Sequence, residues 1–267
     1  MTTQQNPNIV QLFDLTGKAA IVTGGAMGIG QGIALRLAEA GAAVMITDIN
    51  LEAADNTVNQ IRSKGGKAEA INADASSVAD ARRTVQETLR AFGRLDILVN
   101  NAGIAKNALI YNMEPSDWVD VMRVNFGGVF NCTKAVMPHF MARGSGVIVN
   151  ISSVMGERGW VGESNYAASK GAVNAFTRCC AMELARFGVR VNAVLPGFAP
   201  TGLVAELLEK DGGKGIRRQI PMRSFATVEQ VAHTVVFLAG PGSSYMTGTL
   251  VPVDGGASTA LGLGAPL

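Results

Sequence analysis

The stretch from Lys18 to Gly30 reads K-A-A-I-V-T-G-G-A-M-G-I-G and decides the fold. A short apolar run ends at Thr23, a cluster of glycines follows at once, and a helical pattern then runs from Ile29 to Ala40. This order predicts a strand, a tight turn and a helix. Glycines in such a turn let the backbone bend sharply and let a pyrophosphate approach the positive N-terminus of the helix. A plain tight turn is the alternative, because the spacing Gly24-x-x-x-Gly28-x-Gly30 differs from G-x-G-x-x-G.

The same alternation of apolar runs and helical patterns continues along the chain. Further strands are expected at 43–48, 68–71, 95–100, 146–151, 189–194 and 249–253, and further helices at 51–64, 78–92, 118–142 and 164–187. The strands are continuous runs of Val, Ile and Leu, which is typical of a parallel sheet covered by helices on both faces. The sequence therefore predicts an α/β fold with one doubly wound parallel sheet in a single domain, 1–267.

Three segments fall outside this alternation. Residues 1–14 are expected to form a loose N-terminal arm, and residues 257–267 form a tail of small residues. The segment 197–224 contains Pro200 and Asp211-Gly212-Gly213, and its composition indicates a mobile flap over a substrate.

Composition excludes several classes of function. Hydrophobic residues make up 48% of the 267 residues and charged residues 16%, with a mean hydropathy of +0.22, so we expect a compact chain that covers more surface against its own copies. The net charge is +2 and no basic cluster is present, which argues against nucleic-acid binding. No apolar stretch reaches the ~18 residues of a membrane span. Cys132, Cys179 and Cys180 lack ligand spacing and favour a reducing compartment, the cytoplasm. His139 and His233 have no partner at ligand spacing, so no metal site is expected.

Tyr166 and Lys170 are the first candidates for chemistry. They lie four residues apart in an expected helix, so both side chains leave the same face. A free tyrosine has a pKa near ~10, and a positive charge about 4 Å away is sufficient to lower that pKa into the range of a general base. Taken alone, the pair is also compatible with an ordinary surface contact.

Two acidic residues follow the second and third strands. Asp48 comes 24 residues after Gly24, where a carboxylate can accept hydrogen bonds from ribose hydroxyls and would repel a 2′-phosphate. Asp74 can hydrogen-bond an adenine amino group. Either residue can instead cap the helix that follows it. No Arg or Lys lies in the glycine turn or directly after Asp48, so NAD is favoured over NADP.

Together these residues resemble the short-chain dehydrogenase/reductase family from about Leu15 to Gly256. The elements that carry the resemblance are, in family order, the Gly24-Gly28-Gly30 turn, Asn100-Asn101-Ala102-Gly103, Asn125, Ser153, Tyr166, Lys170, Pro196-Gly197 and Thr201. The resemblance implies a Rossmann-like fold and a nicotinamide cofactor.

The resemblance also implies a role for each matching residue. Tyr166 would be the general acid and base, Ser153 would hydrogen-bond the same substrate oxygen, and Lys170 would lower the tyrosine pKa and hold the nicotinamide ribose. Asn125 would anchor a water that relays protons. Ser152 is the alternative to Ser153, and a turn hydroxyl and an interior helix residue are the structural readings of Ser153 and Asn125. The implied cofactor-binding residues are Gly24, Met27, Gly28, Ile29, Gly30, Asp48, Ile49, Asp74, Ala75, Asn101, Ala102, Gly103, Tyr166, Lys170, Pro196, Gly197 and Thr201, with Val124 behind the cofactor.

The expected substrate wall is mostly apolar. It comprises Ser153, Tyr166, Val154, Met155, Trp160, Val161 and Phe198, with Leu203, Val204, Leu207 and Leu208 of the flap. Such a wall favours a secondary alcohol or ketone with hydrocarbon or ring substituents, interconverted with NAD. Glu163, Ser164 and Asn165 keep a sugar or polyol open.

Two other functions remain open at this stage. The chain also resembles NADP-dependent 3-oxoacyl-acyl-carrier-protein reductases through N-Y-A-A-S-K-x-A and V-x-P-V-D-G-G, although Asp48 disfavours NADP and Phe187 stands where those enzymes often carry an arginine. A non-catalytic nucleotide-binding regulator is the remote alternative. By resemblance, a homotetramer built through the Asn125 and Tyr166 helices and through the last strand is expected.

Overall fold

The computed structural model describes residues 8–202 and 212–259. Its strands are β1 (Ala19–Thr23), β2 (Ala43–Asp48), β3 (Lys67–Asn72), β4 (Ile97–Asn100), β5 (Gly146–Ile151), β6 (Val189–Pro196) and β7 (Leu250–Val253). Its helices are α1 (Gly28–Glu39), α2 (Leu51–Ser63), α3 (Val78–Phe92), α4 (Pro115–Met122), α5 (Gly128–Arg143), α6 (Met155–Arg158), α7 (Ser164–Leu184), α9 (Lys214–Arg217) and α10 (Val228–Ala239). Within those residues, no helix is long and apolar enough to cross a membrane.

The seven strands form one parallel sheet in the order β3-β2-β1-β4-β5-β6-β7. The order reverses between β1 and β4, because the chain first builds outward through β2 and β3 and then returns to add β4 on the other side. This is the doubly wound sheet that the sequence predicts. In such sheets ligands bind where the order reverses, outside the carboxyl ends of the strands.

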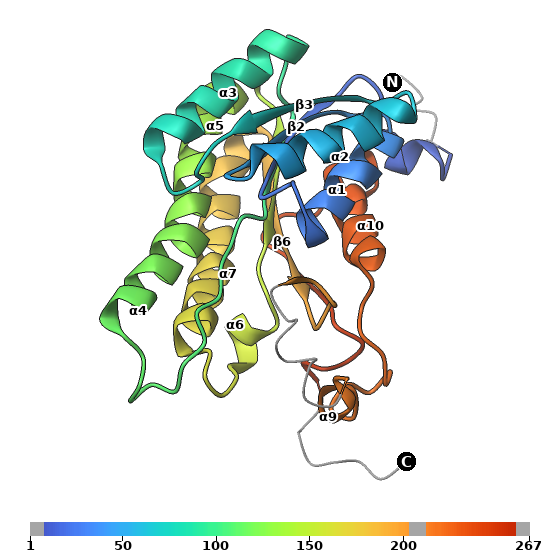
Figure 1. Cartoon of the computed structure of the whole chain (residues 1–267). Helices are drawn as coiled ribbons and strands as arrows, with labels where there is room; N and C mark the ends of the chain where they lie inside the picture. Colours follow the sequence, from blue (N-terminus) through green and yellow to red (C-terminus); the bar gives the residue numbers. More distant parts are fainter. Residues whose placement is uncertain (1–7, 203–211, 260–267) are drawn as a thin grey trace.

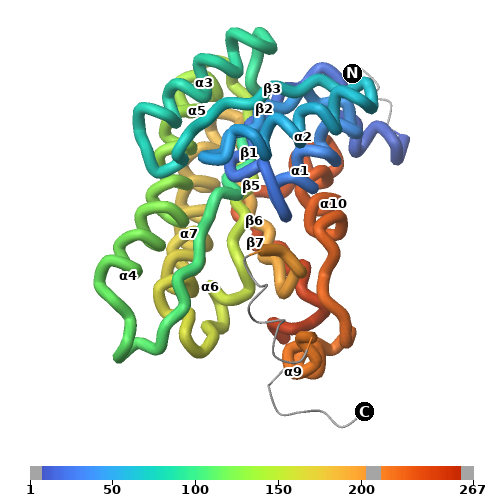
Figure 2. Tube along the Cα trace, viewed as in Figure 1, coloured from blue at the N-terminus to red at the C-terminus, as the bar shows by residue number. Residues whose placement is uncertain are grey.

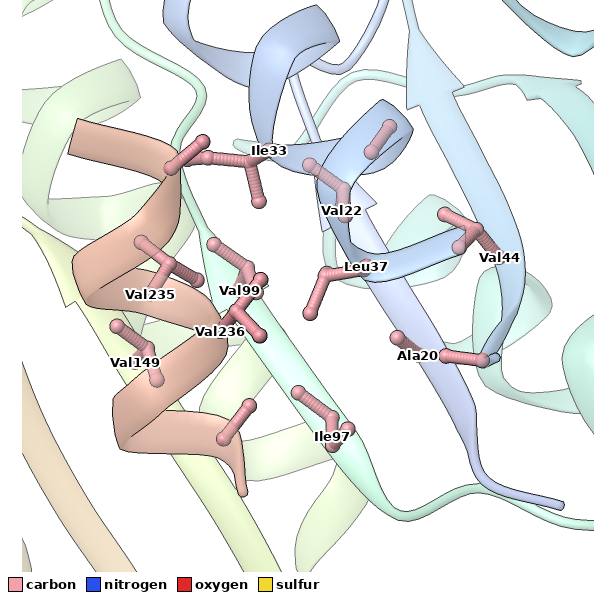
Figure 3. Close-up of a cluster of buried hydrophobic side chains, with 14 of the residues drawn as sticks. Ala20, Val22, Ile33, Leu37, Val44, Ile97, Val99, Val149, Val235 and Val236 are labelled. Carbon is pink, nitrogen blue, oxygen red and sulfur yellow. The ribbon is translucent and has the colours of Figure 1, made fainter. Parts of the chain in front are cut away.

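Helices cover both faces of the sheet. Figure 1 shows α1, α2 and α10 on one side and α3, α5 and α7 on the other, and Figure 2 shows the strands between them. On the first face, Ile33 and Leu37 of α1 and Val235 of α10 pack against strand side chains, and the close-up in Figure 3 shows Val22 and Val99 among them. A buried aliphatic side chain contributes about 1.5–3 kcal/mol, so these two layers hold the sheet rigid.

The sequence-based ranges agree with most elements. The predicted helix over 118–142 is instead α4, a π-helical segment (Arg123–Gly127) and α5 in direct succession. The predicted flap, 197–224, contains α9, and its central residues 203–211 lie outside the described part. The arm, 1–14, includes a short 3-10 helix at Gln11–Phe13 within the described residues.

Asp96 ties together the end of the sheet opposite the strands' carboxyl ends. It lies just before β4, accepts a hydrogen bond from the Ala19 N–H (2.9 Å) and forms ion pairs with Arg94 (2.8 Å), Arg143 (2.7 Å) and Lys18 (3.9 Å). Burial alone would raise its pKa, but the hydrogen bonds from Arg94 and Ala19 and the charge of Arg143 hold the pKa of Asp96 below its usual range. We call this group the Asp96 hub.

Candidate active site

A cavity of about 660 Å³ opens at the carboxyl ends of the strands. It extends from the glycine turn after β1 to the start of α7 and the turn after β6. All seventeen residues that the sequence assigns to a cofactor line it, and so do Ser153, Met155 and Phe198 of the expected substrate wall. The fold thus brings the two sets into one continuous space.

Gly24 and Gly30 in the glycine turn have no room for a side chain. Gly24 and Gly28 have positive φ angles of 61° and 56°, and a Cβ atom on Gly30 would lie 2.0 Å from the carbonyl oxygen of Gly24. The Asn101 amide closes the turn from the far side by donating hydrogen bonds to the carbonyls of Thr23 (3.0 Å) and Gly24 (2.9 Å). The turn therefore presents bare backbone at the N-terminus of α1, which is a favourable place for a pyrophosphate.

Asp48 ends β2 and does not cap α2. Its carboxylate accepts hydrogen bonds from the Ala26 N–H (3.1 Å) in the glycine turn and from the Asn50 N–H (3.0 Å). The cap of α2 is Asn50, whose side chain accepts from Ala53. Asp48 is thereby held at the edge of the cavity, and the capping alternative is wrong.

Asp74 likewise does not cap the helix that follows it. Its carboxylate accepts hydrogen bonds from the N–H and hydroxyl of Ser76 (2.8 and 2.7 Å), whereas Ser77 caps α3. Arg123, which the sequence did not single out, also lines the cavity and pairs with Asp74 (3.6 Å) and Asp120 (3.5 Å). At this end of the cavity the guanidinium of Arg123 is therefore already paired with two carboxylates.

Ser153 and Tyr166 meet at the other end. The Ser153 hydroxyl hydrogen-bonds the Tyr166 phenol and accepts from the Met155 N–H (3.1 Å). The Ser152 hydroxyl instead donates to the backbone carbonyl of Lys170 (3.1 Å), so it is engaged in holding α7 against β5. This geometry favours Ser153 over Ser152 as the partner of Tyr166.

Lys170 lies beneath the tyrosine ring. Its ammonium is 5.5 Å from the ring centroid of Tyr166 and donates a hydrogen bond to the Ile151 carbonyl (2.8 Å). Burial lowers the pKa of Lys170 to about 8. Burial also raises the pKa of Tyr166 to about 12, against the hydrogen bond from Ser153 that lowers it, and the charge of Glu163 raises it further. The pKa of Tyr166 is thus raised in the protein alone, and its lowering by Lys170 stays a prediction.

Asn125 is buried within the π-helical segment and does not line the cavity. Its amide pairs with the backbone of Ile104, accepting from the N–H (2.8 Å) and donating to the carbonyl (3.0 Å), and it also donates to Ser169 (3.1 Å). π-Helical turns within α-helices are frequently found at functional sites. Here the turn fixes the loop after β4 to α7, and the proton relay through Asn125 stays a prediction.

Several residues of the expected substrate wall lie elsewhere. Trp160 does not line the cavity; it packs edge-on against Phe198, with ring centroids 5.4 Å apart. Val154 is buried in the same apolar cluster and Val161 is exposed. Leu203, Val204, Leu207 and Leu208 lie outside the described residues. Phe198 and Met155 thus form the apolar wall that the cavity presents.

Glu163 is a lining residue that the sequence noted only as a possible sugar contact. It precedes α7 directly, is 8% exposed, and its position three residues before Tyr166 is the only signal that the sequence contains. Thr47, Ala73, Ile104, Ala105 and Ile151 also line the cavity without any sequence signal.

The residues present fit a nicotinamide dinucleotide. A cradle that any Cβ would fill suits a pyrophosphate, Asp48 can accept from ribose hydroxyls, and Tyr166 and Lys170 stand at the far end of the same cavity. At that end a phenol and a serine hydroxyl can share one carbonyl oxygen. This arrangement can perform hydride transfer coupled to proton transfer.

Comparison with known proteins agrees with this geometry. The family model described as Enoyl-(Acyl carrier protein) reductase matches residues 24–258. The chain is 41% identical over 242 residues to the 3-oxoacyl-(acyl-carrier-protein) reductase FabG of Thermotoga maritima, covering 91% of this chain and 98% of that protein. It is 42% identical over 243 residues to the short-chain reductase protein NovJ of Streptomyces niveus, covering 89% and 92%.

A solved structure is also similar to the chain over nearly its whole length. The gluconate 5-dehydrogenase of Burkholderia cenocepacia, crystallised with NADP and tartrate, superposes with a TM-score of 0.91 at 37% identity and covers 94% of this chain and 99% of that one. Since the match extends over fold and sequence alike, the chain belongs to the short-chain dehydrogenase/reductase family and is an oxidoreductase that uses a pyridine nucleotide.

Proposed function

We propose that the protein reduces the ketone of 3-oxoacyl thioesters to a secondary alcohol. The observation that carries the proposal is the 41% identity to a protein named as such a reductase over 98% of its length. The Ser153 and Tyr166 hydroxyls beside an apolar wall of Met155 and Phe198 support it. The sequence alone favours a simple hydrophobic alcohol, whereas the similarity supports the 3-oxoacyl alternative better.

In the proposed reaction each residue has a separate task. A bound nicotinamide nucleotide supplies the hydride in reduction and accepts it in oxidation. The Tyr166 phenol, which burial keeps protonated at neutral pH, donates its proton to the substrate oxygen as that oxygen gains electrons. Ser153 donates a second hydrogen bond to the same oxygen and so stabilises its developing charge. Lys170, whose ammonium lies 5.5 Å from the ring centroid of Tyr166, would hold a ribose hydroxyl of the nucleotide.

We propose NADH as the preferred cofactor. The carboxylate of Asp48 is fixed at the cavity edge by Ala26 and Asn50, and a 2′-phosphate placed there would meet a negative charge. Among the described lining residues the cations are Arg123, which pairs with Asp74 and Asp120, and Lys170, at the opposite end. Neither is available to a 2′-phosphate beside Asp48.

A dehydrogenase for another secondary alcohol or a polyol is the second candidate. The similarity to a gluconate 5-dehydrogenase and the polar Glu163 in the cavity favour it. Phe187 itself carries no charge for an acidic carrier protein, but the Arg186 guanidinium lies over its ring at 4.7 Å, so this position does not separate the two candidates.

We further propose a homotetramer in the cytoplasm. Large apolar side chains are exposed on the helices expected at one interface, among them Val119 of α4, Phe130 of α5 and Met182 of α7. The cysteines Cys132, Cys179 and Cys180 are free thiols, which suits a reducing compartment.

The proposal is tested by measuring nucleotide oxidation at 340 nm with acetoacetyl-CoA, 2-pentanone and 5-ketogluconate, each with NADH and NADPH. The proposed function predicts the highest kcat/KM for acetoacetyl-CoA. Tyr166→Phe should lower that value by about 10²–10⁴-fold, because it removes the proton donor. A preference for ketogluconate would replace the proposal by the second candidate, and an unchanged rate in Tyr166→Phe would contradict the assigned chemistry.

A further inference from the structure

Glu163 is a buried carboxyl group without a partner. It forms no side-chain hydrogen bond or ion pair with any residue that the structure describes. Only 8% of the residue is exposed, but its carboxyl oxygens are not completely enclosed by protein atoms. Because Glu163 lines the cavity, this unpaired carboxyl group belongs to a residue that borders the space a substrate would enter.

The surroundings favour the neutral acid. Burial raises the pKa of Glu163 above its usual range. The positive start of α7 favours a negative charge, but the loss of water around an unpaired buried carboxylate opposes it, and burial is the cause that raises the pKa of Glu163. A neutral carboxyl group differs from a carboxylate in that it can donate a hydrogen bond.

Other charged groups do not change this conclusion. The charged or titratable side chains that line the cavity, on α7 and on the elements packed around it, are Asp48, Asp74, Arg123, Tyr166 and Lys170. Arg123 is paired with Asp74 and Asp120, and the Lys170 ammonium donates to the Ile151 carbonyl. On α6, Glu157 and Arg158 are exposed, and Arg158 donates to the Ala257 carbonyl. No described cation therefore neutralises Glu163.

The position of Glu163 relative to Tyr166 sets what it can reach. Glu163 is the N-cap residue of α7 and comes three residues before Tyr166, which lies in the first turn of that helix. The two groups are close enough for the charge of Glu163 to raise the pKa of Tyr166. If Tyr166 and Ser153 hold the reacting oxygen of the substrate, Glu163 is therefore placed to contact a second oxygen on a nearby substrate carbon.

We propose that Glu163, as a neutral carboxylic acid, donates a hydrogen bond to a second carbonyl oxygen of the substrate, two carbons from the reacting ketone. In a 3-oxoacyl thioester this is the thioester carbonyl, so the inference rests on the proposed function and specifies how the site recognises that substrate. Glu163 then selects for ketones that carry a second carbonyl group. Its ionisation removes the donor and places a negative charge beside the phenol.

The test compares Glu163→Leu, which removes the donor, with Glu163→Gln, which keeps an N–H donor and cannot ionise. Glu157→Gln, on the exposed face of α6, is the matched control. Each variant is assayed with acetoacetyl-CoA, 2,4-pentanedione and the monoketone 2-pentanone over a range of pH. Circular dichroism and NADH titration report folding and nucleotide binding separately from turnover.

The proposal predicts that Glu163→Leu lowers kcat/KM for the two dicarbonyl substrates by about ten- to hundredfold, the cost of an unpaired buried polar group, and leaves 2-pentanone unchanged. Glu163→Gln should restore the dicarbonyl rates. It should also lack the decline that the wild type shows as Glu163 ionises with rising pH. Glu157→Gln should match the wild type throughout.

Other outcomes separate the two proposals. If Glu163→Leu keeps the dicarbonyl preference, or loses all three substrates equally, the role of Glu163 is overturned and the proposed function stands. If the wild type reduces 2,4-pentanedione but not acetoacetyl-CoA, the proposed function fails, and the loss of the diketone preference in Glu163→Leu still decides the role of Glu163. Absence of any dicarbonyl preference in the wild type overturns both.

Discussion

At the scale of single residues, Asp48 determines the expected nucleotide. Its carboxylate is held by the backbone N–H groups of Ala26 and Asn50, so it cannot turn away from a bulky anion without breaking both bonds. Replacing the charge while keeping an acceptor oxygen isolates the electrostatic effect.

Asp48→Asn should therefore raise the ratio of kcat/KM for NADPH over NADH by about ten- to hundredfold, because the repulsion of a 2′-phosphate is removed. Steady-state rates with each nucleotide measure the ratio. Asp55→Asn, an exposed acid on α2 outside the cavity lining, is the control and should leave the ratio unchanged. A wild type that already prefers NADPH would contradict the assignment.

The burial of Lys170 can be tested through the pH dependence of the free energy of unfolding. Its pKa is lowered from 10.5 to about 8 by burial, so between these values the unfolded chain binds more protons than the folded one and stability rises with pH. Relative to Lys170→Met, the wild type should gain about 3 kcal/mol across this window, since one pKa unit corresponds to about 1.4 kcal/mol.

Urea denaturation of both proteins at intervals from pH 7.5 to 10.5 measures this difference. Tyr166 titrates alike in both proteins and cancels from the comparison. A difference independent of pH would show that Lys170 is not desolvated.

At the scale of elements, the turn between β1 and α1 has the strictest requirement. Gly30→Ala would place a Cβ atom 2.0 Å from the Gly24 carbonyl oxygen and 2.4 Å from Nδ2 of Asn101. We expect a loss of about 1–3 kcal/mol of stability from overpacking, together with weaker NADH binding as the turn shifts.

Thermal denaturation and fluorescence titration with NADH measure the two effects. Gly127→Ala is the matched helical control, because its Cβ would come no closer than 3.8 Å to Met122 O. That variant should be neutral or slightly more stable. Equal behaviour of the two variants would refute the steric argument.

Many of the helices and strands, and the residues that line the cavity, could be predicted from the sequence. The ranges 43–48, 78–92 and 146–151 agree with β2, α3 and β5 to the residue, because apolar runs and helical periods there are bounded by clear turns. The seventeen residues that are expected to bind the cofactor line one cavity because the carboxyl ends of parallel strands share one edge.

The remaining features depend on contacts that no local pattern encodes. The π-helical segment is fixed by the bonds of Asn125 to Ile104, which lies 21 residues away in sequence. Trp160 was expected against the substrate, but the loop before α7 turns its ring onto Phe198. The unpaired state of Glu163 is a property of its surroundings and has no sequence signal.

At the scale of the whole molecule, exposed apolar side chains on α5 and α7 make assembly testable. Size-exclusion chromatography with light scattering should give four times the 27.8 kDa chain. Phe130→Glu and Met182→Glu should each lower the mass, since both place a charge on a half-exposed or exposed apolar site.

Val78→Glu, on the exposed start of α3, is the control and should keep the wild-type mass. A monomer in the wild type, or no change in either interface variant, would argue against this interface.

The Asp96 hub has a practical consequence for laboratory evolution. It joins the start of β1, the approach to β4 and the end of α5 at the end of the sheet remote from the cavity. Sequence libraries that randomise the loops around Met155, Phe198 and Glu163 leave all of these contacts intact. The protein should therefore tolerate extensive retargeting of its substrate range, provided that Asp96 and its arginines are kept constant in every library.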